Sequence, residues 1–152
     1  MHYQLRLLMI IGIISIFLGG CSLFATSSAS SSNSSASVYE QLGGANKIEE
    51  IVDNFITEIE FNPEIFPYFE KSDVSRFREK LIEHLCMLSN GPCEYTGDTM
   101  VQVHGGMGIT EREFNLTVDL FINAMTKANV SHSLQNKVIA TMTHTREDII
   151  YQ

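Results

Sequence analysis

Tyr95-Thr96-Gly97 is followed closely by Met100-Val101-Gln102-Val103-His104-Gly105-Gly106-Met107-Gly108-Ile109-Thr110. This stretch places one histidine, His104, in an apolar and glycine-rich run, between two segments with the apolar spacing of amphipathic helices. A neutral imidazole offers a nitrogen lone pair to a metal, and glycines let the backbone pass close to a large flat group. The stretch therefore predicts a ligand site centred on His104.

His104 has two interpretations at this point. A buried structural histidine is the commoner role for an isolated imidazole on an apolar run. A bare transition metal needs three or four protein ligands, so one histidine cannot hold such an ion. A single imidazole is enough for haem, because the porphyrin supplies four nitrogens and the protein adds a proximal ligand. The rest of the chain favours haem.

Length and composition indicate one globular domain. The chain has 152 residues, of which 44% are hydrophobic and 18% charged, values typical of a folded protein with a single core. Its formal net charge of −8 argues against nucleic acid as a partner, because nucleic acid needs a basic face. The same acidity disfavours binding of the folded domain to anionic lipid surfaces.

Residues 1–20 are expected to be a lipoprotein signal peptide. Arg6 precedes the apolar run Leu7–Leu18, which as a helix is about 18 Å long and too short to cross a bilayer. The run ends at Leu18-Gly19-Gly20-Cys21, which resembles the bacterial lipobox, whose cysteine is acylated and becomes the new N-terminus. An ordinary signal peptide with a chance cysteine is the alternative.

Residues 21–37 are expected to be an acylated cysteine and a serine-rich tether, because this composition cannot bury a core. Lipidated Cys21 would anchor the protein in a membrane without spanning it. Ser22 stands where other lipoproteins that remain in the inner membrane carry aspartate. By that resemblance we expect the bacterial cell envelope, with the outer membrane favoured and the domain on its periplasmic face.

From residue 38 to 152 the sequence predicts an all-α domain. Ser37 and Glu40 form a capping box, and Gly43-Gly44 ends the short helix that it opens. The next helix is predicted over 45–60, where apolar residues recur at helical spacing. They are Ile48, Ile51, Val52, Phe55, Ile56 and Ile59.

Three further helices are predicted from their starts. Asp73 caps a helix whose apolar stripe runs from Val74 to Leu88. Thr110 opens another in a second capping box, and Ser131 opens the last, whose apolar side continues to Ile149. A compact aromatic segment over 63–69 is expected to form a short helical turn. No segment predicts a strand.

In this order along the chain, several short motifs resemble those of truncated haemoglobins of the first group, the N type. They are Gly43-Gly44, Phe55, Pro67-Tyr68-Phe69, Gly91-Pro92, Tyr95-Thr96-Gly97 and the run from Val103 to Thr110. The resemblance implies a truncated globin fold over 38–152, a two-over-two helical sandwich around haem b. Asn90 replaces one glycine of the family's second pair, and asparagine tolerates the same backbone conformation.

The same resemblance assigns roles to individual positions. It makes His104 the proximal ligand of the haem iron and Phe69 the phenylalanine that packs on the porphyrin face. It places six residues at the wall of the haem pocket, for which plain core packing is the alternative: Met100, Val103, Ile109, Phe114, Val138 and Met142. Arg76 and Lys80 lie one turn apart at the pocket rim, where cations can pair with haem propionates; a solvated helix face is the alternative.

The ligand-binding side of the pocket departs from the family. Members that hold oxygen tightly usually carry a tyrosine after the phenylalanine of helix B, and often a glutamine on helix E. Here those positions are Ile56 and Leu81, with Phe77 at the neighbouring site. A buried hydrogen bond to the partly negative oxygen molecule is worth roughly 1.5–3 kcal/mol. We therefore expect oxygen release about ten- to a hundred-fold faster than in a tyrosine-bearing relative.

The resemblance implies a haem protein that binds oxygen, nitric oxide and carbon monoxide. Oxygen transport and oxidation of nitric oxide to nitrate are both open, and the second needs an external reductase. The apolar pocket argues against efficient turnover, so enzymatic activity is left undecided. The alternative function is a membrane-tethered gas or redox sensor or an electron-transfer module, with Lys80 or His84 as the sixth iron ligand. A haem-free helical lipoprotein is the third possibility.

Cys86 and Cys93 are the two cysteines of the expected domain. An exported domain lies in an oxidising compartment, so a disulfide between them is feasible, and two buried free thiols are the alternative. The chain has no Cys-x-x-Cys pair, so neither a structural zinc site nor a covalent c-type haem attachment is supported.

Overall fold

The computed structural model describes residues 35–152. The expected signal peptide (1–20), the expected acylation site at Cys21 and most of the expected tether lie outside the described residues. Within 35–152 every regular element is helical and there is no strand, so the predicted all-α fold class is confirmed.

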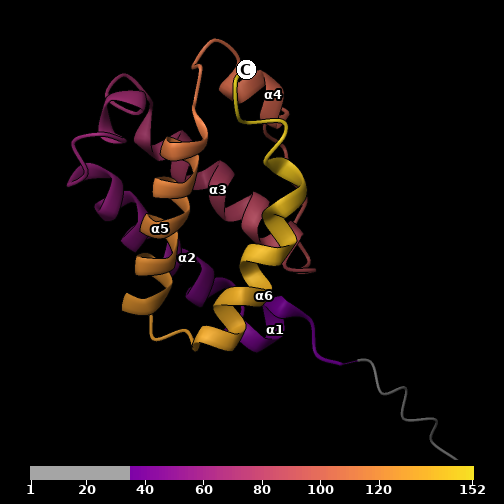
Figure 1. Cartoon of the computed structure of the whole chain (residues 1–152). Coiled ribbons are helices and arrows are strands. Elements are labelled where there is room, and N and C mark those ends of the chain that lie inside the picture. Colours follow the sequence, from indigo (N-terminus) through magenta and orange to yellow (C-terminus); the bar gives the residue numbers. More distant parts are fainter. Residues whose placement is uncertain (1–34) are drawn as a thin grey trace, which may run out of the picture. The chain divides into compact units, whose positions relative to one another are not determined.

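Six α-helices and two 3₁₀ turns follow one another along the described chain (Figure 1). Their bounds are α1 (Val38–Leu42), α2 (Ala45–Glu60), η1 (Phe66–Tyr68), α3 (Val74–Leu88), α4 (Met100–His104), α5 (Glu111–Lys127), α6 (His132–Met142) and η2 (Thr143–Thr145). The short helix α4 was not expected from the apolar pattern, because five residues are too few to show a helical period.

Side-chain caps explain where three of these helices begin. Before α1, the hydroxyl of Ser37 accepts from the amide of Glu40, whose carboxylate accepts from the amide of Ser37. Thr110 and Glu113 make the same reciprocal arrangement at the start of α5. Asp73 accepts hydrogen bonds from two first-turn amides of α3. Each cap satisfies amide donors that have no partner inside the helix.

The core lies where α2 packs against α3 and α5. The buried face of α2 supplies Ile48, Ile51, Val52, Phe55 and Ile59. The rings of Phe55 and Phe121 meet edge to face, with centroids 5.2 Å apart, and tie α2 to α5. Helix α6 packs against α1 and α5. Figure 1 shows α5 and α6 in front of α2 and α3, which is the two-over-two helical sandwich.

A disulfide fixes the loop that follows α3. It joins Cys86, near the end of that helix, to Cys93, with the two Cα atoms 5.8 Å apart. The bridge, and not a pair of free thiols, is therefore what the fold contains. Asn90 takes the left-handed conformation at φ +59°. Gly91 is needed for space, because a Cβ there would lie 2.5 Å from the Tyr39 ring and 2.7 Å from Cys86 Sγ.

The last helix is shorter than its apolar pattern predicts. Helix α6 ends at Met142 and η2 follows, although the pattern continues to Ile149. The hydroxyls of Thr143 and Thr145 donate to backbone carbonyls three residues earlier, over 3.0 and 2.7 Å. Such local hydrogen bonds compete with the α-helical ladder, and the chain tightens into a 3₁₀ turn.

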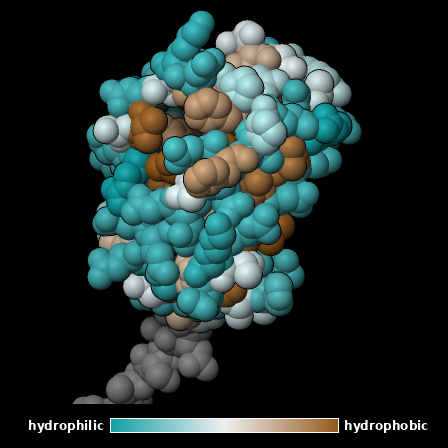
Figure 2. Space-filling view, turned by 90° about the vertical axis from the view of Figure 1, so that its left-hand side faces the viewer, coloured by the Kyte–Doolittle hydropathy of each residue, from teal (hydrophilic) through white to brown (hydrophobic). Residues whose placement is uncertain are grey.

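The surface of the described residues is mostly polar. No helix between residues 35 and 152 is both long and apolar enough to cross a bilayer. Val74, expected on the apolar stripe of its helix, is 56% exposed because it is the first residue of α3. Figure 2 shows hydrophobic residues reaching the surface in patches among hydrophilic ones.

Candidate functional site

A cavity of about 560 Å³ lies inside the helical domain. Side chains from α2, α3, α4, α5, α6 and the segments between them line it, so no single helix builds the site. Its wall is largely apolar, with a few charged groups from α3 and its neighbouring loops. A cavity of this size and composition is typical of a site for a small organic ligand or cofactor.

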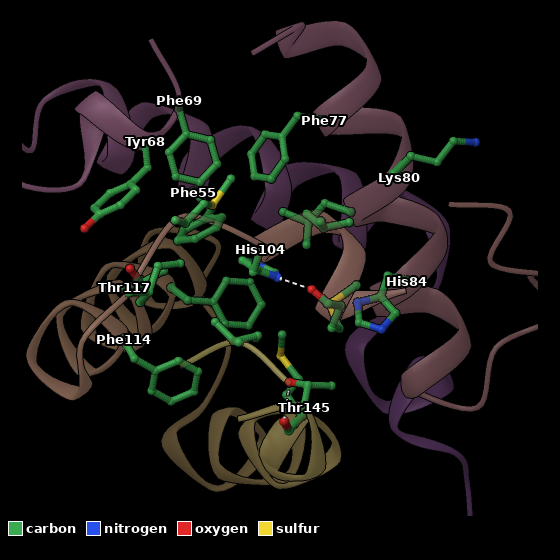
Figure 3. Close-up of a pocket in the computed structure, with 18 of the residues that line it drawn as sticks. Phe55, Tyr68, Phe69, Phe77, Lys80, His84, His104, Phe114, Thr117 and Thr145 are labelled. Atoms are coloured by element: carbon green, nitrogen blue, oxygen red, sulfur yellow. Dashed lines mark hydrogen bonds between the residues drawn. The ribbon is translucent and has the colours of Figure 1, made fainter. Parts of the chain in front are cut away.

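His104 lines this cavity from the last position of α4. Its Nδ1 lies 2.8 Å from the backbone carbonyl of Met100 (dashed line in Figure 3). Because a carbonyl can only accept, Nδ1 is the protonated nitrogen and Nε2 keeps its lone pair. Burial lowers the pKa of His104, and the hydrogen bond to Met100 opposes that shift only in part. The ring is therefore neutral near pH 7 and suited to bind a metal.

A bare metal ion is not what this histidine can hold. Within residues 35–152 no three His, Cys, Asp or Glu side chains cluster closely enough to bind an ion. One neutral imidazole facing a large apolar cavity does fit a haem, whose porphyrin provides the other four nitrogens. The residues present thus agree with the haem expected from the sequence.

Most of the residues expected at a haem pocket line the cavity. From the predicted set these are Phe69, Phe77, Lys80, Leu81, Met100, Val103, Ile109, Phe114 and Met142. The rings of Phe69 and Phe77 pack together, with centroids 4.9 Å apart. Phe77 and Leu81, one helical turn apart on α3, therefore present an apolar surface to whatever occupies the cavity.

The structure differs from the sequence-based expectation at Ile56 and Val138, which do not line this cavity. Ile56 instead borders an adjoining hollow of about 260 Å³, which shares Phe69 and Phe77 with the cavity. Val138 is completely buried in the core. Their neighbours Phe55 and Ile139 take the expected places, because consecutive helical residues point about 100° apart. A register error of one residue therefore exchanges a cavity residue for a core residue.

Lys80 borders the cavity but its ammonium group is already engaged. Nζ contacts Glu79 at 2.7 Å, Glu83 at 3.0 Å and the Thr96 hydroxyl at 2.7 Å. Figure 3 shows the side chain extending away from the other cavity residues. Its hydrogen bonds to Glu79 and then Glu83 raise the pKa of Lys80. These contacts oppose the deprotonation that ligation of iron would require.

Glu83 connects α3 to the loop before α4. It accepts from the amide of Thr96 at 3.0 Å and from its hydroxyl at 2.9 Å. The amide of Thr96 first, and then Lys80, lower the pKa of Glu83 to about 2. The carboxylate therefore stays charged at neutral pH and holds the loop at the cavity edge.

The cavity wall also includes residues that were not assigned to it from the sequence, among them Tyr68, Thr117, Phe121 and Thr145. Thr117 and Phe121 follow Phe114 by three and seven residues, a helical spacing that would have identified them. The hydroxyl of Thr117 donates to the Glu113 carbonyl at 2.9 Å, and that of Thr145 to the Met142 carbonyl at 2.7 Å. The hydroxyl protons of Thr117 and Thr145 are therefore already engaged in hydrogen bonds within the fold.

His84 is the second histidine of the cavity wall. It belongs to α3 and is only 8% exposed. Its ring packs against that of Tyr95, with centroids 4.8 Å apart. Burial lowers the pKa of His84, and the nearby charges of His144 and then His104 lower it further. The imidazole is therefore neutral near pH 7.

Comparisons with known proteins agree with this geometry. Residues 37–151 match the bacterial-like globin family. The group 1 truncated haemoglobin GlbN of Mycolicibacterium paratuberculosis is 30% identical over 107 residues, covering 70% of this chain and 79% of that protein. The group 1 truncated haemoglobin of Tetrahymena pyriformis is 25% identical over 118 residues, covering 78% and 98%. The Fe(III) crystal structure of the Tetrahymena pyriformis truncated haemoglobin has a similar fold, with TM-score 0.74, 24% identity and coverage of 77% and 100%.

Proposed function

This chain belongs to the bacterial-like globin family as a truncated globin with haem iron as its cofactor, and from that premise we propose that it binds oxygen, nitric oxide and carbon monoxide at iron held by His104. One observation carries the proposal. A neutral imidazole, with Nδ1 bonded to a carbonyl and Nε2 free, faces a largely apolar cavity of about 560 Å³.

Different residues of the chain have different roles at this site. The Met100 carbonyl fixes the tautomer and orientation of His104, as outer partners of metal-binding histidines do. The aromatic side chains Phe69, Phe77 and Phe114 give the cavity an apolar wall suited to the faces of a porphyrin. Bound haem supplies the iron that coordinates a diatomic gas.

We propose that this pocket discriminates against oxygen relative to carbon monoxide and nitric oxide. Phe55, Phe77 and Leu81, which α2 and α3 present to the cavity, carry no hydrogen-bond donor. A hydrogen-bond donor would stabilise bound oxygen by roughly 1.5–3 kcal/mol, and carbon monoxide and nitric oxide depend less on such a donor because bound oxygen carries the partial negative charge. Efficient oxidation of nitric oxide is disfavoured for the same reason, since oxygen must remain bound long enough to react.

Leu81→Gln tests this proposal by adding an amide donor to the cavity wall. We expect its oxygen dissociation rate, measured by stopped-flow displacement with carbon monoxide, to fall about ten- to a hundred-fold. Ile56→Gln is the matched control, because Ile56 does not line the cavity, and the oxygen dissociation rate of this variant should stay near that of the unmodified protein. Slow oxygen release from the unmodified protein, as in tyrosine-bearing relatives, would contradict the proposal.

We also propose that the domain works at the bacterial cell envelope, anchored through lipidated Cys21 and supplied with electrons by an external reductase. The support is the apolar run before Cys21, the small residues Gly19 and Gly20, and the serine-rich segment that follows. The Cys86–Cys93 disulfide agrees with an oxidising compartment. The electron-transfer alternative with Lys80 as sixth ligand is disfavoured by the hydrogen bonds that hold its ammonium group.

A further inference from the structure

His84 is a buried polar side chain whose hydrogen-bonding capacity the fold does not use. It is 8% exposed and lines the cavity from α3. Among residues 35–152 the imidazole of His104 has a hydrogen-bond partner, whereas neither ring nitrogen of His84 has one. A neutral imidazole carries one N–H donor and one lone pair. The fully buried side-chain atoms without a partner in the described residues do not include the ring nitrogens of His84, so these nitrogens reach the open space of the cavity, where an acceptor on a ligand can meet the N–H.

Tyr95 fixes the position of this ring. The two rings pack with centroids 4.8 Å apart. The Tyr95 hydroxyl donates to the Asp98 carbonyl at 2.7 Å, so its proton is not directed at His84. Gly97 lies directly against the Tyr95 ring, where a Cβ has no room. The Tyr95-Thr96-Gly97 stretch therefore holds the His84 imidazole at the cavity edge formed by this loop.

Other polar side chains of the cavity wall already have partners within the fold. Each of three cations contacts a carboxylate: Lys80 with Glu83 at 3.0 Å, Arg76 with Asp98 at 3.5 Å and Arg146 with Glu111 at 2.9 Å. Thr117 and Thr145 donate to backbone carbonyls. Compared with these five residues, His84 is the one whose donor remains available to a ligand in the cavity.

We propose that the ring N–H of His84 donates a hydrogen bond to a propionate carboxylate of the haem, and thereby fixes how the haem sits in the cavity. The inference rests on haem binding at His104. The propionates are the strong hydrogen-bond acceptors at the edge of haem b. A hydrogen bond from an N–H to a charged carboxylate is stronger than one to a neutral acceptor. Packing against Tyr95 holds the His84 ring at the edge of the cavity that the Tyr95-Thr96-Gly97 stretch forms. This position opposes the competing role of His84, which is ligation of the iron.

The test compares His84→Phe, which keeps an aromatic ring against Tyr95 but has no donor, with the unmodified protein. Each is loaded with haem b or with haem dimethyl ester, whose carboxylates are blocked. Haem loss is measured by transfer to excess apomyoglobin. With haem b, we expect loss from His84→Phe to be about ten- to a hundred-fold faster. With the dimethyl ester, the two proteins should differ by less than about threefold.

Two variants serve as controls. His84→Gln keeps an N–H donor and should recover much of the slow haem loss. His144→Phe removes an exposed histidine near the same cavity and should leave the rate unchanged. The ratio of the two haem orientations, read by proton NMR of the cyanide-bound ferric protein, should shift in His84→Phe and not in His144→Phe.

Equal haem loss from His84→Phe and the unmodified protein would overturn the inference. So would a low-spin ferric spectrum that turns high-spin in His84→Phe, because His84 would then be an iron ligand. If His84→Phe does not fold, the ¹⁵N shifts of the His84 ring decide the matter in the unmodified protein. They should differ between haem b and its dimethyl ester, and identical shifts would refute the contact. Failure of haem binding itself is seen separately, as absence of the Soret band.

Discussion

At the scale of single residues, the site depends on one imidazole and the carbonyl that orients it. His104 ends α4, and its Nδ1 bonds to Met100 one turn earlier in the same short helix. This hydrogen bond leaves Nε2 with its lone pair, as the proposed iron ligand requires, and burial keeps the ring neutral by lowering its pKa. Protonation would remove the lone pair, so the environment that excludes water also preserves the ligand.

Replacement of His104 by glycine is expected to abolish stable haem binding. The purified His104→Gly protein should show little Soret absorbance, because the variant lacks the Nε2 ligand that is proposed to hold the iron. Added free imidazole should restore part of the absorbance by occupying the space left by the side chain. His144→Gly, which removes an exposed histidine, is the control and should retain its haem. Unchanged haem uptake and carbon monoxide binding in His104→Gly would refute the assignment.

At the scale of elements, the loop from residue 89 to residue 99 matters because it joins α3 to α4. The Cys86–Cys93 disulfide ties its beginning to α3. Two hydrogen bonds from Thr96 to Glu83 tie its second half to the same helix. The position of α4, and with it His104, therefore depends on contacts that cross from the loop to α3.

Glu83 makes the stability of the domain sensitive to acid. Its pKa falls from 4.5 to about 2 on folding, chiefly through the Thr96 amide. The unfolded chain binds more protons in this range, so the contribution of Glu83 is complete above pH 4.5 and is lost as the pH falls towards 2. We expect Glu83→Gln to be less stable at pH 7 and to lose less stability between pH 4.5 and 2.

Urea unfolding, followed by circular dichroism at several pH values, measures this difference. Glu94→Gln is the control, because Glu94 is an exposed residue of the same loop. Its stability should follow the unmodified protein across the whole range. Parallel curves for Glu83→Gln and the unmodified protein would show that Glu83 does not stabilise the folded state through its charge.

At the scale of the whole molecule, the proposal combines a gas-binding domain with a lipid anchor. The domain has an acidic chain and no described helix able to span a bilayer. In this proposal the acyl chains on Cys21 attach the protein to the membrane, and the serine-rich segment lets the domain move away from it. Such an arrangement would place a gas-binding haem where diatomic gases enter the cell.

Cys21→Ala tests the anchor directly. In a bacterial host, we expect the unmodified protein to incorporate labelled palmitate and to sediment with the membrane fraction. The Cys21→Ala protein should incorporate no label and should leave the membrane fraction, since two anchoring signals would be lost together. Ser22→Ala is the matched control and should remain lipidated. If the unmodified protein and Ser22→Ala were both soluble and unlabelled, the proposed lipid anchor would be wrong. The proposal that the domain binds haem would not be affected.

The limits of sequence reasoning are clearest at neighbouring positions. The pattern identified the helix that carries Phe55 and Ile56, yet in the structure Phe55 lines the cavity and Ile56 lines the adjoining hollow. The same exchange occurs between Val138 and Ile139. One residue corresponds to about 100° on a helix, and only the packing of several helices fixes that rotation.

The sequence by itself determined all the α-helices except α4, and the starts of several of them, because capping residues such as Ser37 and Thr110 act within four residues of chain. It also singled out His104, since the apolar and glycine-rich surroundings of that residue are local. Tertiary structure alone decided that Lys80 is held by carboxylates, that Cys86 reaches Cys93 and that His84 faces the cavity. These outcomes depend on distances between side chains, which no local pattern specifies.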